Sequence, residues 1–202
     1  YNNEFLSQQT THFAQDVARM GRTLWAQVRD GSDTLLRQSD TEWLVNSLGP
    51  TTVAYADTIT QTIYGAYTNA TTRTSYEYDS YGNVIEERND GNIERVGDET
   101  LVVRTFAPNT SEWIVNLPFR EQLSAEVWAP VLQETRYLYD NQAWGTAPTD
   151  GQLTGFVTGK SGLWATTTYG YDGYGNPTVV TDPRGNTTLT EYDTEFHLYP
   201  VE

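Results

Sequence analysis

The sequence predicts an all-β protein, a curved strip of antiparallel β-hairpins with one short helix near the N-terminus. Thr, Tyr, Val and Trp are abundant among the 202 residues, and Thr runs recur. Such β-branched and aromatic side chains favour a pleated sheet surface. Lys160 is the single lysine, whereas long helices favour residues such as Lys and Ala. The third observation is a strand–turn–strand pattern that repeats along the chain.

The helix is expected over Thr11–Met20. Phe13, Val17 and Met20 are spaced as on one face of a helix, and Gly21 follows as a helix-terminating residue. This is the one stretch of the chain whose apolar spacing indicates helix.

A hairpin is expected next. Thr23–Arg29 alternates as a strand does, the turn-forming segment Asp30–Asp33 follows, and residues 34–39 return. Residues 51–68 contain no strand-breaking residue before Gly65 and indicate one long strand.

The repeated pattern has two full copies of the form Tyr-x-Tyr-Asp-x-Tyr-Gly-Asn. Their defined residues are Tyr76, Tyr78, Asp79, Tyr81, Gly82 and Asn83, and Tyr169, Tyr171, Asp172, Tyr174, Gly175 and Asn176. Partial copies comprise Tyr137, Tyr139 and Asp140; Asp182, Pro183, Gly185 and Asn186; and Tyr192 and Asp193.

Each residue type in the pattern has a local physical role. Tyr76 and Tyr78 are two residues apart and share one face of a strand. Asp79 ends the strand by bonding nearby backbone N–H groups, and Gly82-Asn83 tolerates the positive φ of a tight reversal. Return strands are expected over 84–88, 177–181 and 187–192, while Asn89–Asn92 should interrupt the run between Ile85 and Ile93.

Composition excludes several function classes. The formal net charge is −15, so nucleic acid is an unfavourable partner and anionic lipid repels the chain. No apolar stretch is long enough to be a membrane helix. The chain has no Cys and only two His, His12 and His197, which lie far apart in the sequence. We therefore expect no metal, no cofactor and no thiol chemistry.

The recurring residues allow a structural and a functional interpretation. The aspartates could serve as calcium ligands or acid–base groups, but a carboxylate repeated at every turn is typical of turn capping. The tyrosines and tryptophans could stack on sugar rings, but cross-strand aromatic ladders, which we favour, also account for them. No Gly-x-Ser-x-Gly motif is present, and no pair of carboxylates can be nominated as catalytic.

The two full copies resemble the YD repeat of the Rhs family, whose pattern is Tyr-Asp-x-x-Gly-Asn followed by an apolar strand. Asp182–Thr188 with Tyr192-Asp193 resembles its continuation. Three further segments resemble the middle of the B component of bacterial insecticidal toxin complexes and related Salmonella virulence proteins: Phe106–Pro118, Glu134–Asp140 and Tyr192–Pro200. The resemblance covers residues 70–202 well and residues 1–69 weakly.

The resemblance implies a non-catalytic wall segment. Family members wind β-hairpins into a hollow shell that encloses a toxic polypeptide, and in toxin complexes a C component completes the shell. The expected partners are other repeats of the parent shell, a partner toxin subunit and an encapsulated polypeptide toxin, in a secreted or cell-surface bacterial protein. The family's aspartate-dependent self-cleaving segment has no match here, so self-cleavage is not carried over.

The chain opens with Tyr1 and not with Met, and we expect it to be part of a larger protein. We expect residues 1–69 to form an N-terminal hairpin region and residues 70–202 a YD-repeat strip, in one continuous unit. The alternative function is an extracellular carbohydrate- or receptor-binding β-module. An enzyme such as a glycosidase ranks last.

Overall fold

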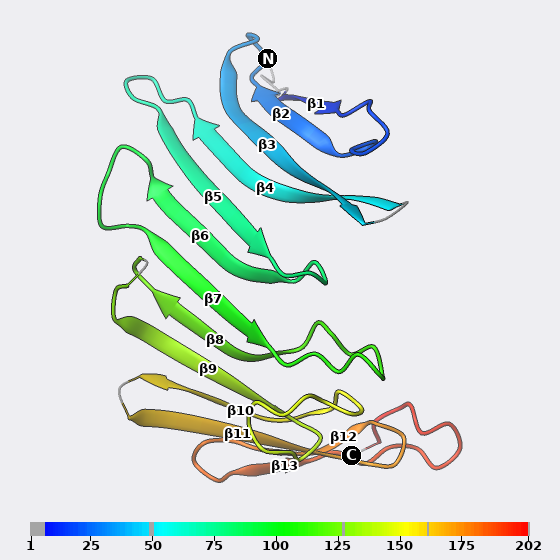
Figure 1. Ribbon diagram of the computed structural model, residues 1–202. Helices are drawn as coiled ribbons and strands as arrows, with labels where there is room; N and C mark the ends of the chain where they lie inside the picture. Colours follow the sequence, from blue (N-terminus) through cyan, green and yellow to red (C-terminus); the bar gives the residue numbers. More distant parts are fainter. Residues whose placement is uncertain (1–6, 49–50, 127, 161, 202) are drawn as a thin grey trace, which may run out of the picture. The chain divides into compact units, whose positions relative to one another are not determined.

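The computed structural model describes residues 7–48, 51–126, 128–160 and 162–201. These residues form thirteen β-strands and no helix (Figure 1), and strands that are neighbours in the sheet are consecutive in the sequence. The ladders from β1 to β6 and from β8 to β13 are antiparallel. The prediction of an all-β chain of antiparallel hairpins is confirmed. The described residues include no helix that is long and apolar enough to cross a membrane.

The chain divides into two compact units. Unit 1 comprises residues 1–101 and 125–128, and unit 2 comprises residues 102–124 and 129–202. One strand, β7 (Thr100–Phe106), runs across the division between them. The sequence-based division at residues 69 and 70 remains a prediction.

Unit 1 contains six consecutive strands joined by hairpin ladders. Residue pairs such as Trp25 with Asp40 and Thr60 with Arg73 fix the register of its ladders. The strands are β1 (Gln8–Phe13), β2 (Thr23–Arg29), β3 (Leu35–Leu48), β4 (Thr51–Ile63), β5 (Ala70–Tyr78) and β6 (Val84–Asn92). The long strands β3 and β4 bend along their length (Figure 1).

Unit 2 contains six further strands in the same arrangement. Arg120 lies opposite Arg136, and Val157 lies opposite both Arg136 and Thr166, so one face continues across four strands. The strands are β8 (Pro118–Ser124), β9 (Val131–Tyr139), β10 (Leu153–Lys160), β11 (Leu163–Tyr171), β12 (Pro177–Thr181) and β13 (Thr187–Leu189).

The predicted helix over Thr11–Met20 is wrong. Thr11 and His12 belong to β1 and pair with Ala26 and Trp25, and the chain then reverses in a turn. Val17 is 92% exposed and Met20 is 68% exposed. A helix with that apolar stripe would find nothing to pack against, whereas the strand gains a ladder of backbone hydrogen bonds.

Several strand boundaries also differ from the sequence-based expectation. The return strand predicted over 34–39 continues as β3 to Leu48, and the strand predicted over 187–192 ends at Leu189. The strand predicted over 51–68 ends at Ile63. Asn89–Asn92 does not interrupt its strand, because β6 continues to Asn92 through a register shift opposite Thr72–Thr74. A β-bulge places one extra residue in β6 here, so the turn-forming residues stay within the strand. Gly91 in this bulge has a φ of 58°.

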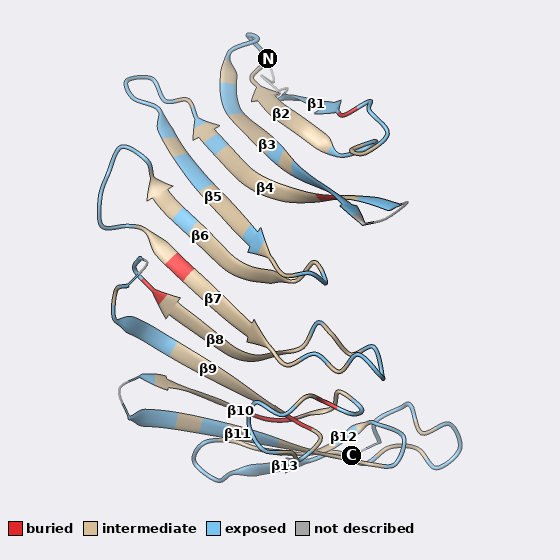
Figure 2. Ribbon diagram, in the orientation of Figure 1, coloured by how far each residue is buried: buried red, intermediate tan, exposed pale blue. Residues whose placement is uncertain are grey.

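Neither unit has a thick core. Among the described residues, five apolar side chains are buried: those of Ala14, Ala54, Leu101, Tyr139 and Pro148. Most strand residues are half-buried (Figure 2). The exposed area is 13697 Å², against about 9,600 Å² for a compact monomer of this mass. Hydrogen-bonded ladders and contacts along the strands therefore hold each unit together, more than burial does.

Candidate functional site: the repeated tyrosine–aspartate turns

The turn between β5 and β6 is built around Asp79. Its Oδ1 accepts hydrogen bonds from the backbone N–H groups of Tyr81 and Asn83 at 2.8 and 2.9 Å. Its Oδ2 accepts the side-chain amide of Asn83 at 2.8 Å. The Asp79 N–H donates to the Asn83 carbonyl at 3.0 Å, and the Gly82 N–H donates to the Asp79 carbonyl at 3.2 Å. Because Gly82 has a φ of 87°, the chain reverses here without the steric cost of a Cβ atom.

Two further turns repeat these bonds. Asp172 accepts from the N–H groups of Tyr174 and Asn176 and from the Asn176 amide at 2.9, 2.9 and 3.0 Å. Asp182 accepts from the N–H groups of Arg184 and Asn186 and from the Asn186 amide, each at 2.8 Å. The equivalent glycines, Gly175 and Gly185, have φ values of 87° and 85°. The pattern Asp-x-x-Gly-Asn thus encodes one turn geometry, and Pro183, which has no N–H group, occupies a position that this geometry does not use as a donor.

A fourth turn of this geometry lies where the sequence indicated only a turn. The Asp30 Oδ1 accepts from the N–H groups of Ser32 and Thr34 at 2.8 and 2.9 Å. Asp33, with a φ of 65°, stands in the place of the glycine, and Thr34 stands in the place of the asparagine. Asp33 and Thr34 do not match the Gly-Asn of the repeat, so residue type could not reveal this turn. Only the spacing could have done so, because Asp30 bonds the N–H groups two and four residues later, as Asp79 does.

Asp140 and Asp193 cap longer loops in the same way, by accepting hydrogen bonds from backbone N–H groups. Asp140 accepts from the N–H groups of residues 149–152, including that of Gln152 at 2.8 Å. Asp193 accepts from the N–H groups of residues 195–199, including that of Tyr199 at 2.9 Å. Each carboxylate thereby satisfies backbone donors that have no strand partner.

These hydrogen bonds lower the pKa of several of the capping carboxyl groups. The side-chain amide of Asn186 is the main cause for Asp182, and backbone N–H donation led by Tyr199 is the main cause for Asp193. Burial raises the pKa of Asp140, but the N–H donors of its loop outweigh burial and leave the pKa lowered. A carboxyl group with a lowered folded-state pKa stabilises the fold above its unfolded pKa, about 3.9. That stabilisation is lost as the pH falls through the folded pKa.

We expect acid to destabilise the chain through these turns. The free energy of unfolding, measured by urea denaturation followed by Trp fluorescence, should hold between pH 7 and pH 5 and fall below about pH 4. Asp193→Asn should be less stable at pH 7 and should show a smaller loss at low pH. Glu195→Gln removes the same charge two residues away and should keep the native pH profile. An unchanged profile in Asp193→Asn would contradict the capping role.

Four of these capping aspartates follow a tyrosine, and the hydroxyl of that tyrosine makes a recurring contact. The hydroxyl of Tyr78 donates to the Ala56 carbonyl at 2.7 Å, and that of Tyr139 to the Pro118 carbonyl at 3.0 Å. Tyr171 donates to the Leu153 carbonyl at 2.7 Å, and Tyr192 to the Pro177 carbonyl at 3.3 Å.

Three of the acceptors, Pro118, Leu153 and Pro177, are the first residues of their strands, whereas Ala56 lies inside β4 just past the end of the ladder with β5. The ladder of β4 with β5 ends at Thr58 and Ser75, for example, and the Tyr78 hydroxyl bonds two residues further along β4. The hydroxyl therefore extends strand pairing past the ladder. The sequence indicated the face on which the tyrosine lies but not this bond.

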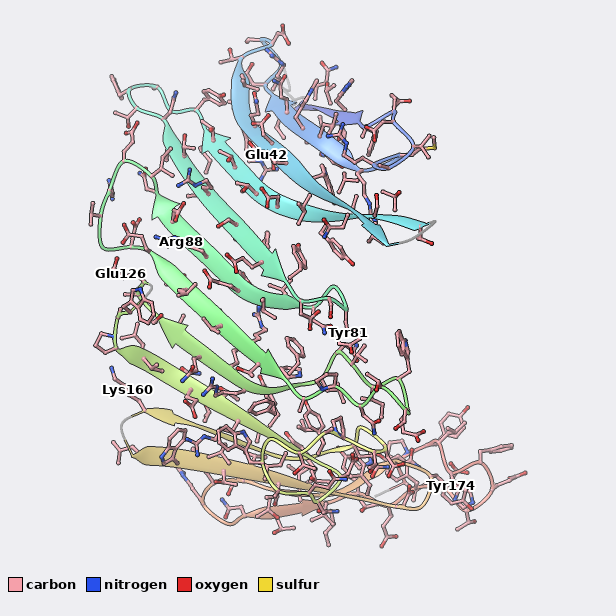
Figure 3. The ribbon with its side chains drawn as sticks, viewed as in Figure 1. Glu42, Tyr81, Arg88, Glu126, Lys160 and Tyr174 are labelled. Atoms are coloured by element: carbon pink, nitrogen blue, oxygen red, sulfur yellow. The ribbon has the colours of Figure 1, made fainter. Side chains whose placement is uncertain are left out.

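Some of the other repeat tyrosines form ring contacts. The Tyr76 and Tyr78 rings are 6.5 Å apart, the Tyr55 and Tyr78 rings 4.7 Å, and the Phe156 and Tyr169 rings 6.3 Å. Burial raises the pKa of Tyr137. Tyr81 and Tyr174 lie in their turns (Figure 3), 39% and 69% exposed.

Two tryptophans of unit 2 enclose an arginine. The Arg136 guanidinium lies 4.5 Å from the Trp144 ring centroid and 4.4 Å from that of Trp164. The indole N–H of Trp144 donates to the Phe119 carbonyl at 2.9 Å. This set of Arg136, Trp144 and Trp164, called the Arg136 stack below, ties the loop after β9 to β9 and β11.

The aspartates of the repeats occur one to a turn, each with its own amide donors. Among the described residues, no group of three or more His, Cys, Asp or Glu side chains could hold a metal ion. The two histidines stack on separate aromatic rings: His12 lies 5.3 Å from the Trp25 ring and His197 lies 3.9 Å from the Tyr174 ring. The arrangement is suited to fixing turns.

No family model matches the sequence, and no curated protein matches it. Solved structures do match the fold. A Photorhabdus luminescens Tc holotoxin pore with a mutated TccC3 matches at a TM-score of 0.58 and 11% identity, over 91% of this chain and 15% of that one. The TcdB2-TccC3 complex matches at a TM-score of 0.56 and 10% identity, over 91% of this chain and 16% of that one. Its form without the hypervariable C-terminal region matches at a TM-score of 0.59 and 12% identity, over 91% of this chain and 15% of that one.

This chain therefore spans only about 15% of the length of the toxin chains that it matches. At 10–12% identity the likeness concerns the fold. It agrees with the toxin-complex resemblance of the repeated tyrosine–aspartate segments, and the chain has the fold of a segment of these Tc toxin proteins.

Proposed function

We propose that this chain is a structural, non-catalytic segment of the wall of a toxin-encapsulating shell in a bacterial toxin complex. The observation that carries the proposal is the repeated turn in which one aspartate caps the reversal and the preceding tyrosine bonds the neighbouring strand. Repeating one device at successive hairpins serves to build an extended sheet.

The exposed area supports the same role. Each unit lacks a second layer among its described residues, and the chain exposes roughly 4,000 Å² more than a compact monomer of its mass would. Sheets that are hydrophobic on one face normally bury it against another layer. We infer that neighbouring repeats of a longer chain, a partner toxin subunit or an enclosed polypeptide covers part of this surface, in a secreted protein.

The edge strands make this proposal testable. The outer edges of β1 and β13 carry backbone groups without a strand partner among the described residues, and such edges favour pairing with another chain. The isolated 202-residue chain should therefore associate in sedimentation velocity experiments as its concentration rises, or should unfold at low temperature in calorimetry. A monodisperse, thermally robust monomer would count against a wall segment.

The alternative is a carbohydrate-binding module, and exposed aromatic rings are the observation that favours it. Trp113 is 72% exposed and Trp128 is 99% exposed. The other tryptophans are more enclosed, and the Trp43 indole N–H donates to the Thr23 carbonyl at 2.8 Å. A glycan array discriminates the two functions: specific binding lost in Trp113→Ala or Trp128→Ala would support the module.

A further inference from the structure

The Arg136 stack fixes an arginine side chain while leaving its terminal N–H groups available. The guanidinium lies against two indole rings, at 4.5 and 4.4 Å from their centroids. Its Nε donates to the Glu134 carboxylate at 2.6 Å. Nη1 and Nη2 have no acceptor among the residues that the structure describes, and the side chain remains 36% exposed. The fork of terminal N–H donors is therefore fixed in orientation and open to a ligand.

A second arginine stands beside it on the same face. Arg120 of β8 is directly opposite Arg136 of β9, and residues directly opposite in an antiparallel pair share a face. Arg120 Nη2 donates to the Thr105 hydroxyl at 3.3 Å, while its buried Nε has no partner. Two like charges directly opposite each other destabilise a sheet unless an anion lies between them.

Both carboxylate oxygens of the nearby Glu134 already accept hydrogen bonds. Glu134 accepts from Arg136 through Oε1 and from the Gln122 amide through Oε2 at 2.7 Å. Arg136 and Arg120 both act electrostatically on this one carboxylate, which leaves a local excess of positive charge in a chain with a net charge of −15. A second carboxylate would balance it.

The geometry selects the kind of anion. A planar carboxylate meets a guanidinium fork with two parallel hydrogen bonds, which an ammonium group cannot reproduce. The Trp144 ring is engaged by Arg136 and by an edge contact with Phe119 at 5.6 Å. It is therefore poorly placed to stack on a sugar ring.

We propose that the Arg136 stack, with Arg120, is a docking site for an Asp or Glu side chain of the polypeptide that covers this face of unit 2. The site follows from the contacts within unit 2, whereas the identity of its occupant as polypeptide rests on the proposed wall function. The stack pre-orders the arginine, so the incoming carboxylate finds its partner already in place.

Titration of the 202-residue chain with the peptide acetyl-Gly-Glu-Gly-amide tests this site. The readouts are the NMR signals of the Arg136 Nε–H and the Trp164 indole N–H. Saturable shifts are expected, with affinity about tenfold weaker in Arg136→Lys, which keeps the charge and loses the fork. Arg120→Lys should weaken binding less. The matched control Arg184→Lys changes an exposed arginine in a turn and should bind as the native chain does.

Several outcomes would overturn the proposal. Equal shifts with acetyl-Gly-Gln-Gly-amide would show that the carboxylate is not recognised. If Arg136→Lys bound the peptide with native affinity and an otherwise unchanged backbone spectrum, the paired N–H donors of the guanidinium would not contribute to binding. Tighter binding of glucuronate than of the Glu peptide would make the occupant a sugar acid. None of these results bears on the sedimentation test, so the proposed wall function and the proposed docking site can be rejected independently of each other.

Discussion

Tyr139→Ala is expected to lower the free energy of unfolding by about 3–5 kcal/mol, the range for removing a large buried ring. Tyr139 is the single aromatic residue that is buried among the described residues, at 8% exposed. Its hydroxyl donates to the Pro118 carbonyl at 3.0 Å. Burial raises the pKa of Tyr139 to about 12, so the hydroxyl keeps its proton as a donor across the stable pH range. Urea denaturation at pH 7 measures the loss.

Two variants separate the ring from the hydroxyl. Tyr139→Phe keeps the ring and loses one hydrogen bond, for an expected cost of about 1 kcal/mol. Tyr67→Ala removes a tyrosine that is 99% exposed and should change stability by less than about 0.5 kcal/mol. Equal effects of Tyr139→Ala and Tyr67→Ala would show that burial of this ring does not stabilise the sheet.

Gly82→Ala is expected to be the most damaging of the glycine substitutions in the repeated turns. Its φ of 87° imposes a cost of roughly 1–2 kcal/mol on any residue with a Cβ. The added Cβ would also lie 2.7 Å from the Tyr55 hydroxyl oxygen. The Tyr55 ring contacts the Tyr78 ring at 4.7 Å, so its displacement adds roughly 1–3 kcal/mol of overpacking.

Two matched glycines isolate these contributions. Gly185 has a φ of 85° and open space within 4 Å of the point that an added Cβ would occupy, so Gly185→Ala should show the backbone cost alone. Gly173 has an open environment and no left-handed φ, so Gly173→Ala should be nearly neutral. Stability should therefore decrease in the order Gly173→Ala, Gly185→Ala, Gly82→Ala, as read from denaturation midpoints. A reversed order would remove the Tyr55 contact from the explanation.

Much of the strand order could be predicted because its determinants are local. Strand β2 was expected over Thr23–Arg29 and β12 over residues 177–181, and both are found with those bounds. Alternating side chains and turn residues act within a few positions of each other, so short-range pattern suffices. The prediction of a helix over Thr11–Met20 was wrong because the apolar spacing within ten residues carries no information about the partner strand at residues 23–29.

The turns follow from the chain's own residue order: Asp79, Gly82 and Asn83 make their bonds within five residues, and so do their counterparts at Asp172 and Asp182. Three features became visible only in the folded sheet. They are the carbonyl that each tyrosine hydroxyl bonds, the equivalent turn that Asp30 forms with other residue types, and the position of Arg136 between Trp144 and Trp164. The difference is largely one of range. Turn bonds close within a few residues of the chain, whereas hydroxyl bonds and the Arg136 stack need strands whose relative position is fixed by ladder register.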